Sequence, residues 1–464
     1  MNKKPLVVTL MSTAVLGMML ATSCKKDNTD LTNDRTVSAA GPSGPSGSCP
    51  DSTITGVITA NLNLKSCRVY KLQGLVYVAN NATLTIEPGT TIKGIKGAAG
   101  QPGGGLIITR GSKLIAQGTE TDPIIFTSNE AVPASGDWSG IVLLGKAPTN
   151  HPSAVIVEGI TNNPPADATY GGPTNNDPND NSGILKYVRI EYAGYELATD
   201  NELNGLTLAG VGKGTTLDYI EVYKSNDDAF EFFGGTVDAS HLLAIDALDD
   251  LFDTDNGYSG KISYALGVSD LSRADKSQSN GFESDNNANG DPLSPYTHPT
   301  YEFVTIVGQP SQAAASITNG APSTTGRYGR AAHLRRNAEF AINRSIFLGF
   351  NYGISLDTQR PVGAAVNTKT KYDNGISTLT ANFVQAFILP YATEVNGSGY
   401  TAITPTSGNA GFTSANPNAN IGLNNPFGTT RTVNNYIPNA LSSAKAFGAF
   451  PTGSTTWANG WSRF

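Results

Sequence analysis

One short pattern recurs four times between residues 204 and 286, and it constrains the fold more than any other feature. In each copy, apolar and polar residues alternate around one apolar anchor, and Gly, Asn or Asp bounds the copy. Alternation with a period of two predicts a half-buried strand, and the bounding residues favour turns. The anchors follow one another after 24, 22 and 30 residues, which is too close for helical crossovers and is typical of stacked coils. The anchors are Leu206, Phe230, Phe252 and Phe282.

Strand-like runs separated by turn residues extend over most of the chain. Runs such as 75–78 and 216–223 are flanked by Gly, Asn or Lys, and no long segment shows helical periodicity. We therefore predict an all-β protein, a single-stranded parallel β-helix solenoid. Long loops are often functional or irregular, and we expect lateral loops near 145–183, 286–299 and 309–329, with irregular C-terminal loops and a cap over 392–464.

Stacking of the repeats would place acidic side chains in one column. If the anchors point inward, the residues after them point outward on rungs about 4.8 Å apart. Two carboxylates about 5 Å apart repel each other by about 1 kcal/mol in bulk water and more where water is excluded. A solvated acidic face needs no ligand, whereas a covered one needs protons, arginines or a cation. Because calcium prefers several oxygen ligands, we predict a calcium site formed by Glu231, Asp253, Asp255, Glu283 and Asp285.

Two basic residues extend this column. Aligning Ala332 with the anchors puts His333 after Glu283 and Arg335 after Asp285, so both are predicted ligand contacts. A polysaccharide lyase needs a cation and a base, and a glycoside hydrolase needs two suitably spaced carboxylates. The Gly-His-Gly and Arg-Ile-Lys motifs of β-helix polygalacturonases are absent, and nothing matches a nucleophilic triad or a nucleotide-binding loop. Whether the protein is an enzyme stays open, and the sequence favours binding without catalysis.

The N-terminus predicts export and lipid attachment. Lys3 and Lys4 precede an apolar run over 6–20, which is short for a membrane span and typical of a signal peptide. The following Ala-Thr-Ser-Cys resembles the lipobox of bacterial lipoproteins, which implies cleavage before Cys24 and acylation of that residue. We thus predict a signal peptide over 1–23, a flexible Ser-, Gly- and Pro-rich tether over 24–48 and a β-helix domain over 49–464.

Two cysteines remain after Cys24. Cys49 and Cys67 lie 18 residues apart, in a chain that is predicted to leave the cytoplasm. A disulfide between them is the economical interpretation, and two free buried thiols is the alternative. The disulfide would close a loop at the start of the solenoid, where unpaired strand edges need an N-terminal cap.

Several runs of the chain resemble a known group of proteins. They are ATLTIEPGTTIKG, GSKLIAQGTETDPIIFTS, GDWSGI, SNDDAFEFFGGTVDASH and ALDDLFDTDNGYSGKI. These runs resemble right-handed parallel β-helix lipoproteins with a pectin-lyase-like fold, which are common in Bacteroidetes and occur in spirochaete outer membranes. The resemblance covers most of residues 53–464 and implies a right-handed β-helix, but it brings no established activity.

The predicted function combines these features. A net charge of −7 and a pI near 5.2 argue against a nucleic-acid partner, which needs a clustered basic face. We predict a protein lipid-anchored at the outer membrane, facing the periplasm or the cell surface. It would bind glycan or another extracellular ligand along its lateral face, with calcium as the one candidate cofactor. The alternatives are a carbohydrate-active enzyme, a lyase before a hydrolase, or an adhesin or structural spacer that binds surface proteins.

Overall fold

The computed structural model covers the predicted β-helix domain. It describes residues 37–39, 49–98, 100–160, 164–198, 201–358, 365–395, 399–452 and 456–464. The predicted signal peptide (1–23) and Cys24 lie outside the described residues. Of the predicted tether (24–48), only β1 (Val37–Ala39) is described, and it pairs antiparallel with β2 (Ser52–Ile58). In the described part of the chain, no helix has the length and apolar character that crossing a bilayer requires.

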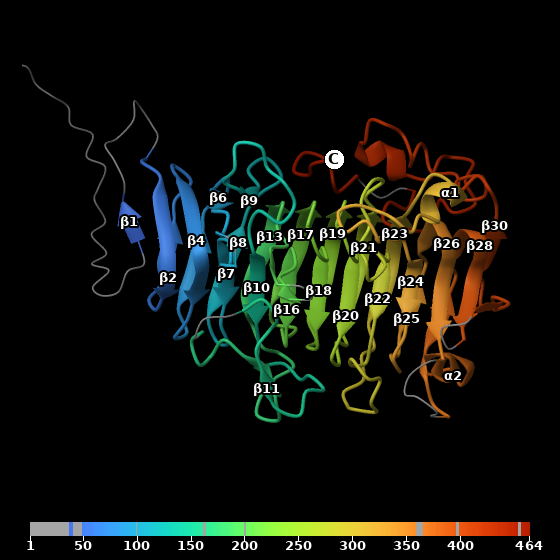
Figure 1. Cartoon of the computed structure of the whole chain (residues 1–464), viewed down its shortest axis with the longest axis horizontal. Helices are drawn as coiled ribbons and strands as arrows, with labels where there is room; N and C mark the ends of the chain where they lie inside the picture. Colours follow the sequence, from blue (N-terminus) through green and yellow to red (C-terminus); the bar gives the residue numbers. More distant parts are fainter. Residues whose placement is uncertain are drawn as a thin grey trace, which may run out of the picture. The chain divides into compact units, whose positions relative to one another are not determined.

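Stacked strands form a parallel β-helix with three ladders of strands (Figure 1). Among the described residues, 26 strands belong to one sheet, and nearly all neighbours in it pair in parallel. The predicted all-β solenoid is thereby confirmed. The first ladder is formed by parts of β2 and β4 (Val69–Val78), β7 (Gly105–Ile108), β10 (Gly140–Leu144), β16 (Leu206–Ala209), β18 (Phe230–Phe233), β20 (Phe252–Asp255), β22 (Phe282–Ser284), β24 (Arg330–Leu334), and parts of β26 (Ile346–Asp357) and β28 (Phe383–Glu394).

The other two ladders share several long strands, which bend from one ladder into the next. The second ladder contains β3 (Leu62–Leu64), β5 (Thr83–Ile86), β8 (Lys113–Gln117), the first parts of β13 (Gly183–Glu191), β17 (Thr216–Tyr223), β19 (Ala239–Ile245), β21 (Lys261–Val268) and β23 (Thr300–Val307), then β25 (Ala341–Asn343) and β27 (Thr378–Thr380). The third contains β6 (Thr91–Gly94), β9 (Ile124–Ser128), the later parts of β13, β17, β19, β21 and β23, the first parts of β2, β4, β26 and β28, and β30 (Ala410–Thr413).

Short elements decorate the loops between the coils. They are the hairpins β11 (Ala154–Val155) with β12 (Tyr170–Gly171) and β14 (Glu196–Ala198) with β15 (Asn201–Glu202), the strand β29 (Tyr400–Ala402), the helices α1 (Gln312–Ala315) and α2 (Thr368–Asp373), and the 3-10 helix η1 (Val433–Tyr436).

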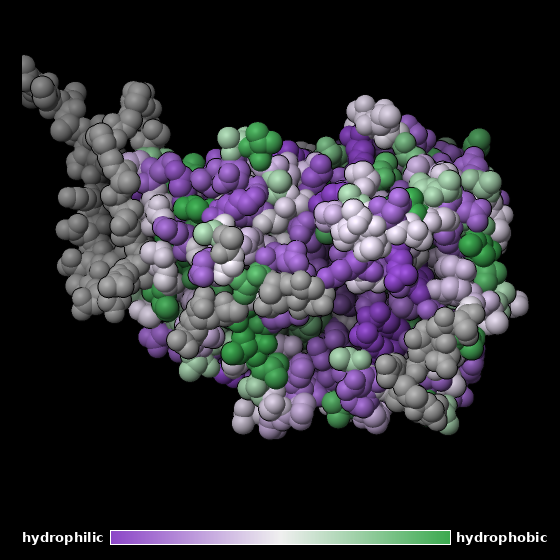
Figure 2. Space-filling view, in the orientation of Figure 1, coloured by the Kyte–Doolittle hydropathy of each residue, from purple (hydrophilic) through white to green (hydrophobic). Residues whose placement is uncertain are grey.

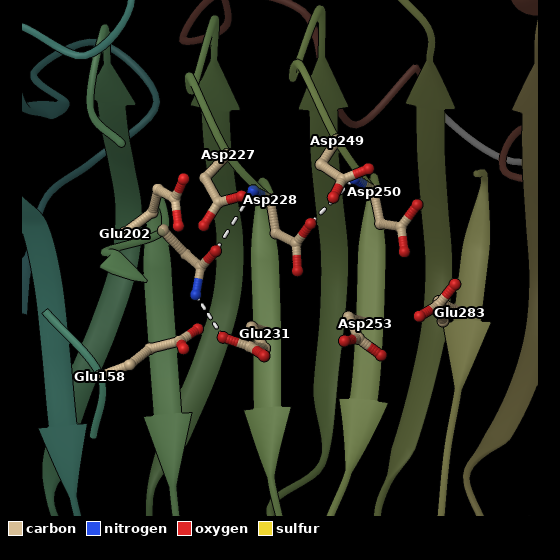
Figure 3. Close-up of a pocket in the computed structure, with 10 residues that line it drawn as sticks. Glu158, Glu202, Asp227, Asp228, Glu231, Asp249, Asp250, Asp253 and Glu283 are labelled. Atoms are coloured by element: carbon tan, nitrogen blue, oxygen red, sulfur yellow. Dashed lines mark hydrogen bonds between the residues drawn. The ribbon is translucent and has the colours of Figure 1, made fainter. Parts of the chain in front are cut away.

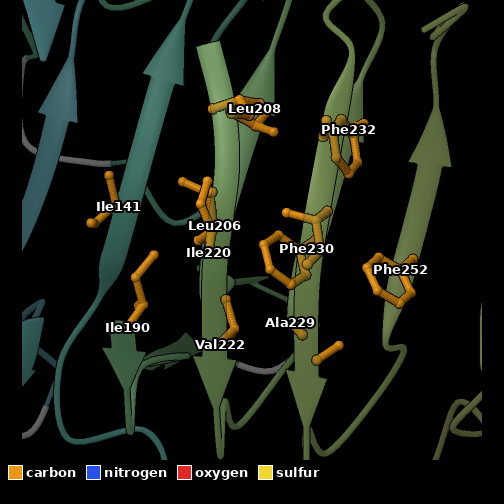
Figure 4. Packing of buried hydrophobic residues seen from close by; sticks show 14 of the residues in the cluster. Ile141, Ile190, Leu206, Leu208, Ile220, Val222, Ala229, Phe230, Phe232 and Phe252 are labelled. Carbon is orange, nitrogen blue, oxygen red and sulfur yellow. The ribbon is translucent and has the colours of Figure 1, made fainter. Parts of the chain in front are cut away.

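The predicted anchors stack in register inside the solenoid. Leu206 pairs with Phe230, Phe230 with Phe252, and Phe252 with Phe282, so the predicted register is confirmed. These four side chains are fully buried, and the rings of Phe230 and Phe252 stack with centroids 5.4 Å apart (Figure 4). Burial of the anchors thus stabilises the stacking of successive coils. Because side chains alternate along a strand, the residue after each anchor points to the outer face.

The C-terminal segment, which we define as residues 421–452 and 456–464, covers the outer face of the third ladder. Apolar residues there, such as Leu243 and Leu266, pack with Tyr436, Trp457 and Trp461 in a second hydrophobic cluster. Trp461 lies against Tyr187 of β13, with ring centroids 5.9 Å apart, so the segment runs back along the solenoid toward its middle (Figure 1). This differs from the cap predicted over 392–464, because the outward apolar residues of the third ladder need to be covered.

The start of the solenoid is joined covalently. Cys49 and Cys67 form a disulfide with their Cα atoms 5.2 Å apart. The backbone N–H of Cys49 also donates to the carbonyl of Cys67. The bridge therefore ties the segment before β2 to the turn before β4.

Candidate functional site

The predicted acidic column lies on the outer face of the first ladder. Glu231 pairs with Asp253, and Asp253 pairs with Glu283 in successive rungs. The column is not an open, solvated face, because Glu231 is 6% and Glu283 9% exposed. Two elements from elsewhere in the chain reach over it, the loop after β11 with Glu158 and the strand β15 with Glu202.

A pocket of about 200 Å³ lies over these rungs, and carboxylates line almost all of it (Figure 3). We call it the carboxylate pocket. Among the described residues that line it there is no Lys, Arg or His. It is lined by Glu158, Glu202, Asn204, Asp227, Asp228, Glu231, Asp249, Asp250, Asp253 and Glu283.

Four aspartates of this pocket were missed by the sequence analysis. Asp227 and Asp228 precede the anchor Phe230, and Asp249 and Asp250 precede Phe252 at the same spacing. In the sequence, Asp228 and Asp250 stand at the boundaries of the repeats, where Asp also favours a turn. The signal that could have revealed them was the doublet Asp-Asp two positions before an anchor, repeated in consecutive coils.

One column of this set is a hydrogen-bonded ladder. The N–H of Asp228 donates to Oδ1 of Asn204 at 3.2 Å, and the N–H of Asp250 donates to Oδ1 of Asp228 at 2.8 Å. The N–H of Asn280 donates in turn to Oδ1 of Asp250 at 2.5 Å. Each side chain thus satisfies a backbone donor of the next coil, which fixes its orientation toward the pocket.

The chemistry of this column changes between its ends and its centre. At the ends, Nδ2 of Asn204 donates to Glu231, and Nδ2 of Asn280 donates to Glu283 at 3.0 Å. The two central positions are aspartates, which have no such donor when ionised. Within the described part of the chain, the buried Oδ1 of Asp253 has no hydrogen-bond partner.

Burial and mutual repulsion raise the pKa values of these carboxyl groups. Burial is the largest cause for Asp228, Glu231 and Asp253, and neighbouring carboxylates raise their pKa values further above the ordinary range. The same causes raise the pKa of Asp255 to about 8. Burial and the neighbouring carboxylates therefore favour the protonated forms of these groups.

Oxygen atoms of the pocket come close enough to share an ion. One oxygen each from Asp228, Glu231 and Asp253 lies within 4.8 Å of the others, as does one each from Asp227, Asp228 and Asp249. These are the hard oxygen ligands that calcium prefers. The residues therefore fit a divalent cation in chemical type and in spacing.

The remaining predicted site residues belong to a different arrangement. Arg335 pairs with both Glu283 and Asp285, and Nη1 of Arg336 lies 2.7 Å from Asp285. Nε2 of His333 lies 3.1 Å from Glu394. The five carboxylates of the predicted calcium site therefore have different partners. Arginines pair with Glu283 and Asp285. Glu231 and Asp253 line the carboxylate pocket, which Glu283 lines as well.

His333 and Arg335 are held in this ion-paired network. His333 is 5% exposed, and Nδ1 lies 3.5 Å from Glu283. The side chain of Arg335 is 23% exposed and contacts both acidic residues of its column. Both residues thus lie beside buried carboxylates, and their use as ligand contacts stays a prediction.

A second pocket, of about 490 Å³, adjoins the carboxylate pocket and shares Glu158 and Glu231 with it. We call it the mixed pocket, because aromatic, aliphatic, amide and acidic residues line it. Asp255, a member of the predicted calcium site, lies here. Figure 2 shows hydrophobic residues gathered over the region of β11, next to a hydrophilic band. The two pockets together form a continuous lateral site with one anionic part and one amphipathic part.

Comparisons with known proteins agree with this architecture. The model of the pectate-lyase-like β-helix domain family matches residues 56–462. No curated protein and no solved structure matches the chain. Because the matched region covers most of the sequence and the coils stack as such a domain requires, the chain belongs to the pectate-lyase-like β-helix domain family.

Proposed function

We propose that this protein binds a glycan on the lateral face of its β-helix, with a calcium ion held in the carboxylate pocket. It does so without catalysis, as a lipoprotein anchored through Cys24 at the outer membrane. The observation that carries the proposal is the central rung of the pocket. There Asp228 and Asp250 occupy the positions that the amide donors Asn204 and Asn280 occupy in the flanking rungs, beside the carboxylate of Asp253.

The buried carboxylates of the pocket need partners that compensate their charge. A buried carboxylate is stable when it is protonated, ion-paired or bound to a metal. Amides partner Glu231 and Glu283, whereas Oδ1 of Asp253 has no hydrogen-bond partner among the described residues. A calcium ion between Asp228, Glu231 and Asp253 would supply the missing positive charge.

The glycan part of the proposal rests on the mixed pocket. Protein sites for sugars combine partly exposed rings with planar hydrogen-bonding groups, and Phe233, Asn287 and Asp255 line this pocket. Its volume of about 490 Å³ lies in the range of ligand sites. Membership of a pectate-lyase-like family agrees with a carbohydrate-related role.

Calorimetry on the purified domain tests the metal. We expect calcium to bind to the wild type and to release protons, because the pKa values of its ligands are raised. Asp253→Asn should lower the affinity at least tenfold, whereas the exposed Glu130→Gln should leave it unchanged. Absence of calcium binding to a folded wild type would refute the metal part of the proposal.

A panel of immobilised polysaccharides, with and without calcium, tests the glycan. We expect retention of the domain by at least one polysaccharide and loss of retention in a chelator. The same mixtures are assayed for unsaturated sugar products. Their formation would replace the binding function with a lyase, and retention by none of the glycans would end the proposal.

A further inference from the structure

The mixed pocket is built by parts of the chain that lie far apart in sequence. Phe233 ends β18, Tyr170 lies in β12, and Ile156 and Leu293 come from two different lateral loops. Tyr170 is 4% exposed, its ring packs against Phe233 with centroids 5.8 Å apart, and its hydroxyl lies 3.1 Å from Nε2 of His151. Tyr170 is therefore held by packing on one side and by His151 on the other, and Phe233 is a partly exposed ring of the pocket.

The rim of this pocket is apolar on both sides. Ile156 is 47% and Leu293 is 37% exposed to solvent, and both line the pocket. Exposed aliphatic residues are common singly on a protein surface. Here two of them, from separate loops, face one cavity together with Phe233, so an apolar group of a ligand would remove them from water.

The polar groups of the pocket suit hydroxyls better than anions. Glu158, Glu231 and Asp255 line it, so an anionic group would be repelled. Asn150 is 4% exposed, and its Nδ2 donates to the carbonyl of Asn286 at 2.6 Å. Its Oδ1 has no hydrogen-bond partner within the described residues, which leaves an acceptor for a ligand hydroxyl.

We propose that the mixed pocket selects a neutral sugar ring that carries a methyl group, as in a 6-deoxyhexose or an O-acetylated hexose. The ring lies over Phe233, its hydroxyls donate to Asn150 and Asp255, and its methyl group fills the space between Ile156 and Leu293. This inference rests on the proposed glycan function and names the class of sugar that the site takes.

Matched sugars on biosensor surfaces test the inference in calcium-containing buffer. One surface carries D-fucose and a second carries D-galactose, which differ only in the hydroxyl at C6, and a third carries 6-O-acetylgalactose. We expect about tenfold tighter binding to one or both methyl-bearing sugars than to galactose, the discrimination that one apolar group gives in a pocket. The sugar that gains the affinity distinguishes the deoxy source from the acetyl source.

Variants at the rim locate the effect. Ile156→Asn and Leu293→Asn change exposed side chains, so the fold should persist, and each should reduce the preference to less than threefold. Val132→Asn, at a residue that is 85% exposed and outside the pocket, should leave it intact. Equal binding of fucose, acetylgalactose and galactose would overturn this inference and leave the proposed function standing. Failure to bind any glycan would overturn both.

Discussion

Two halves of one column on the same face of the β-helix are neutralised in opposite ways. In the first half, Glu231 and Asp253 line the carboxylate pocket, and no basic residue is among the described residues of its lining. In the second half, Glu283 and Asp285 contact Arg335, and His333 follows Glu283 on the next rung. Glu231, Asp253 and Glu283 each directly follow their anchor, and Asp285 lies two residues beyond Glu283. The two halves differ in what the next coil provides.

The pKa values follow this difference. Burial alone would raise the pKa of Glu283, but the Arg335 guanidinium and His333 lower it to about 2. Burial and neighbouring carboxylates instead raise the pKa values of Glu231 and Asp253 well above their usual range. Asp285 is intermediate, because burial raises its pKa even beside two arginines. The protein thus supplies its own cations in one half and leaves the other half to protons or a metal.

The largest expected effect comes from removing Arg335, which pairs with both carboxylates of the second half. Arg335→Met should lower the free energy of unfolding by about 3 kcal/mol, because it leaves Glu283 and Asp285 buried without this partner. Thermal denaturation in calcium-free buffer measures the loss. Arg327→Met is the control, since Arg327 is exposed, and it should change stability by less than about 0.5 kcal/mol. Equal effects of the two variants would contradict the assigned role of Arg335.

The stacking of the coils and the position of the acidic column could be predicted from the sequence. The anchors Leu206, Phe230, Phe252 and Phe282 fixed the register, because parallel stacking keeps equivalent residues of successive coils side by side. The same alignment placed His333 beside Glu283, as observed. Regular pairing of this kind depends on local patterns that a single sequence contains.

The features that the sequence did not predict depend on contacts between segments that lie far apart in the chain. Glu158 and Glu202 cover the column from a loop and a hairpin, and no local pattern indicates where such loops fold back. The aspartate pairs before Phe230 and Phe252 also suit simple turns, so only their stacking revealed a ladder. The C-terminal segment covers the third ladder for a similar reason, since its Trp461 lies far in sequence from its partner Tyr187.

The carboxyl groups also make the stability of the fold depend on pH. The pKa of Asp255 is raised to about 8 in the fold and lies near 4 in the unfolded chain. The folded state therefore holds a proton that the unfolded state loses, and its stabilising contribution is complete below pH 4 and disappears as the pH rises to 8. The sign is opposite for Glu283, whose contribution is lost as the pH falls toward 2.

Asp255→Asn should therefore act mainly at high pH. We expect the variant to be more stable than the wild type by about 2 kcal/mol at pH 8 without calcium, because one pKa unit corresponds to about 1.4 kcal/mol and partial exposure of Asp255 to water reduces the full effect. At pH 4 the two proteins should unfold at nearly the same temperature. Melting curves at the two pH values measure this difference, and a wild type whose stability is flat from pH 4 to 8 would refute it.

The smallest expected effect comes from replacing Asn280, the last amide of the hydrogen-bonded ladder, with aspartate, which extends the run of aspartates by one coil. Asn280→Asp keeps the Oδ1 acceptor that the N–H of Arg330 uses at 2.9 Å, but it removes the donor to Glu283. Nδ2 of Asn280 also donates to the carbonyl of Gln278 at 2.9 Å. The loss of these two hydrogen bonds and the added repulsion should cost about 1.5 kcal/mol without calcium. Asn61→Asp is the matched control, because Oδ1 of Asn61 also accepts a backbone N–H of another coil, from Thr83 at 2.9 Å, in an exposed setting. Calcium should restore the stability of Asn280→Asp and leave Asn61→Asp unchanged, since only the former extends the carboxylate pocket. If calcium fails to distinguish the two variants, the boundary between the halves is not set by the exchange of asparagine for aspartate.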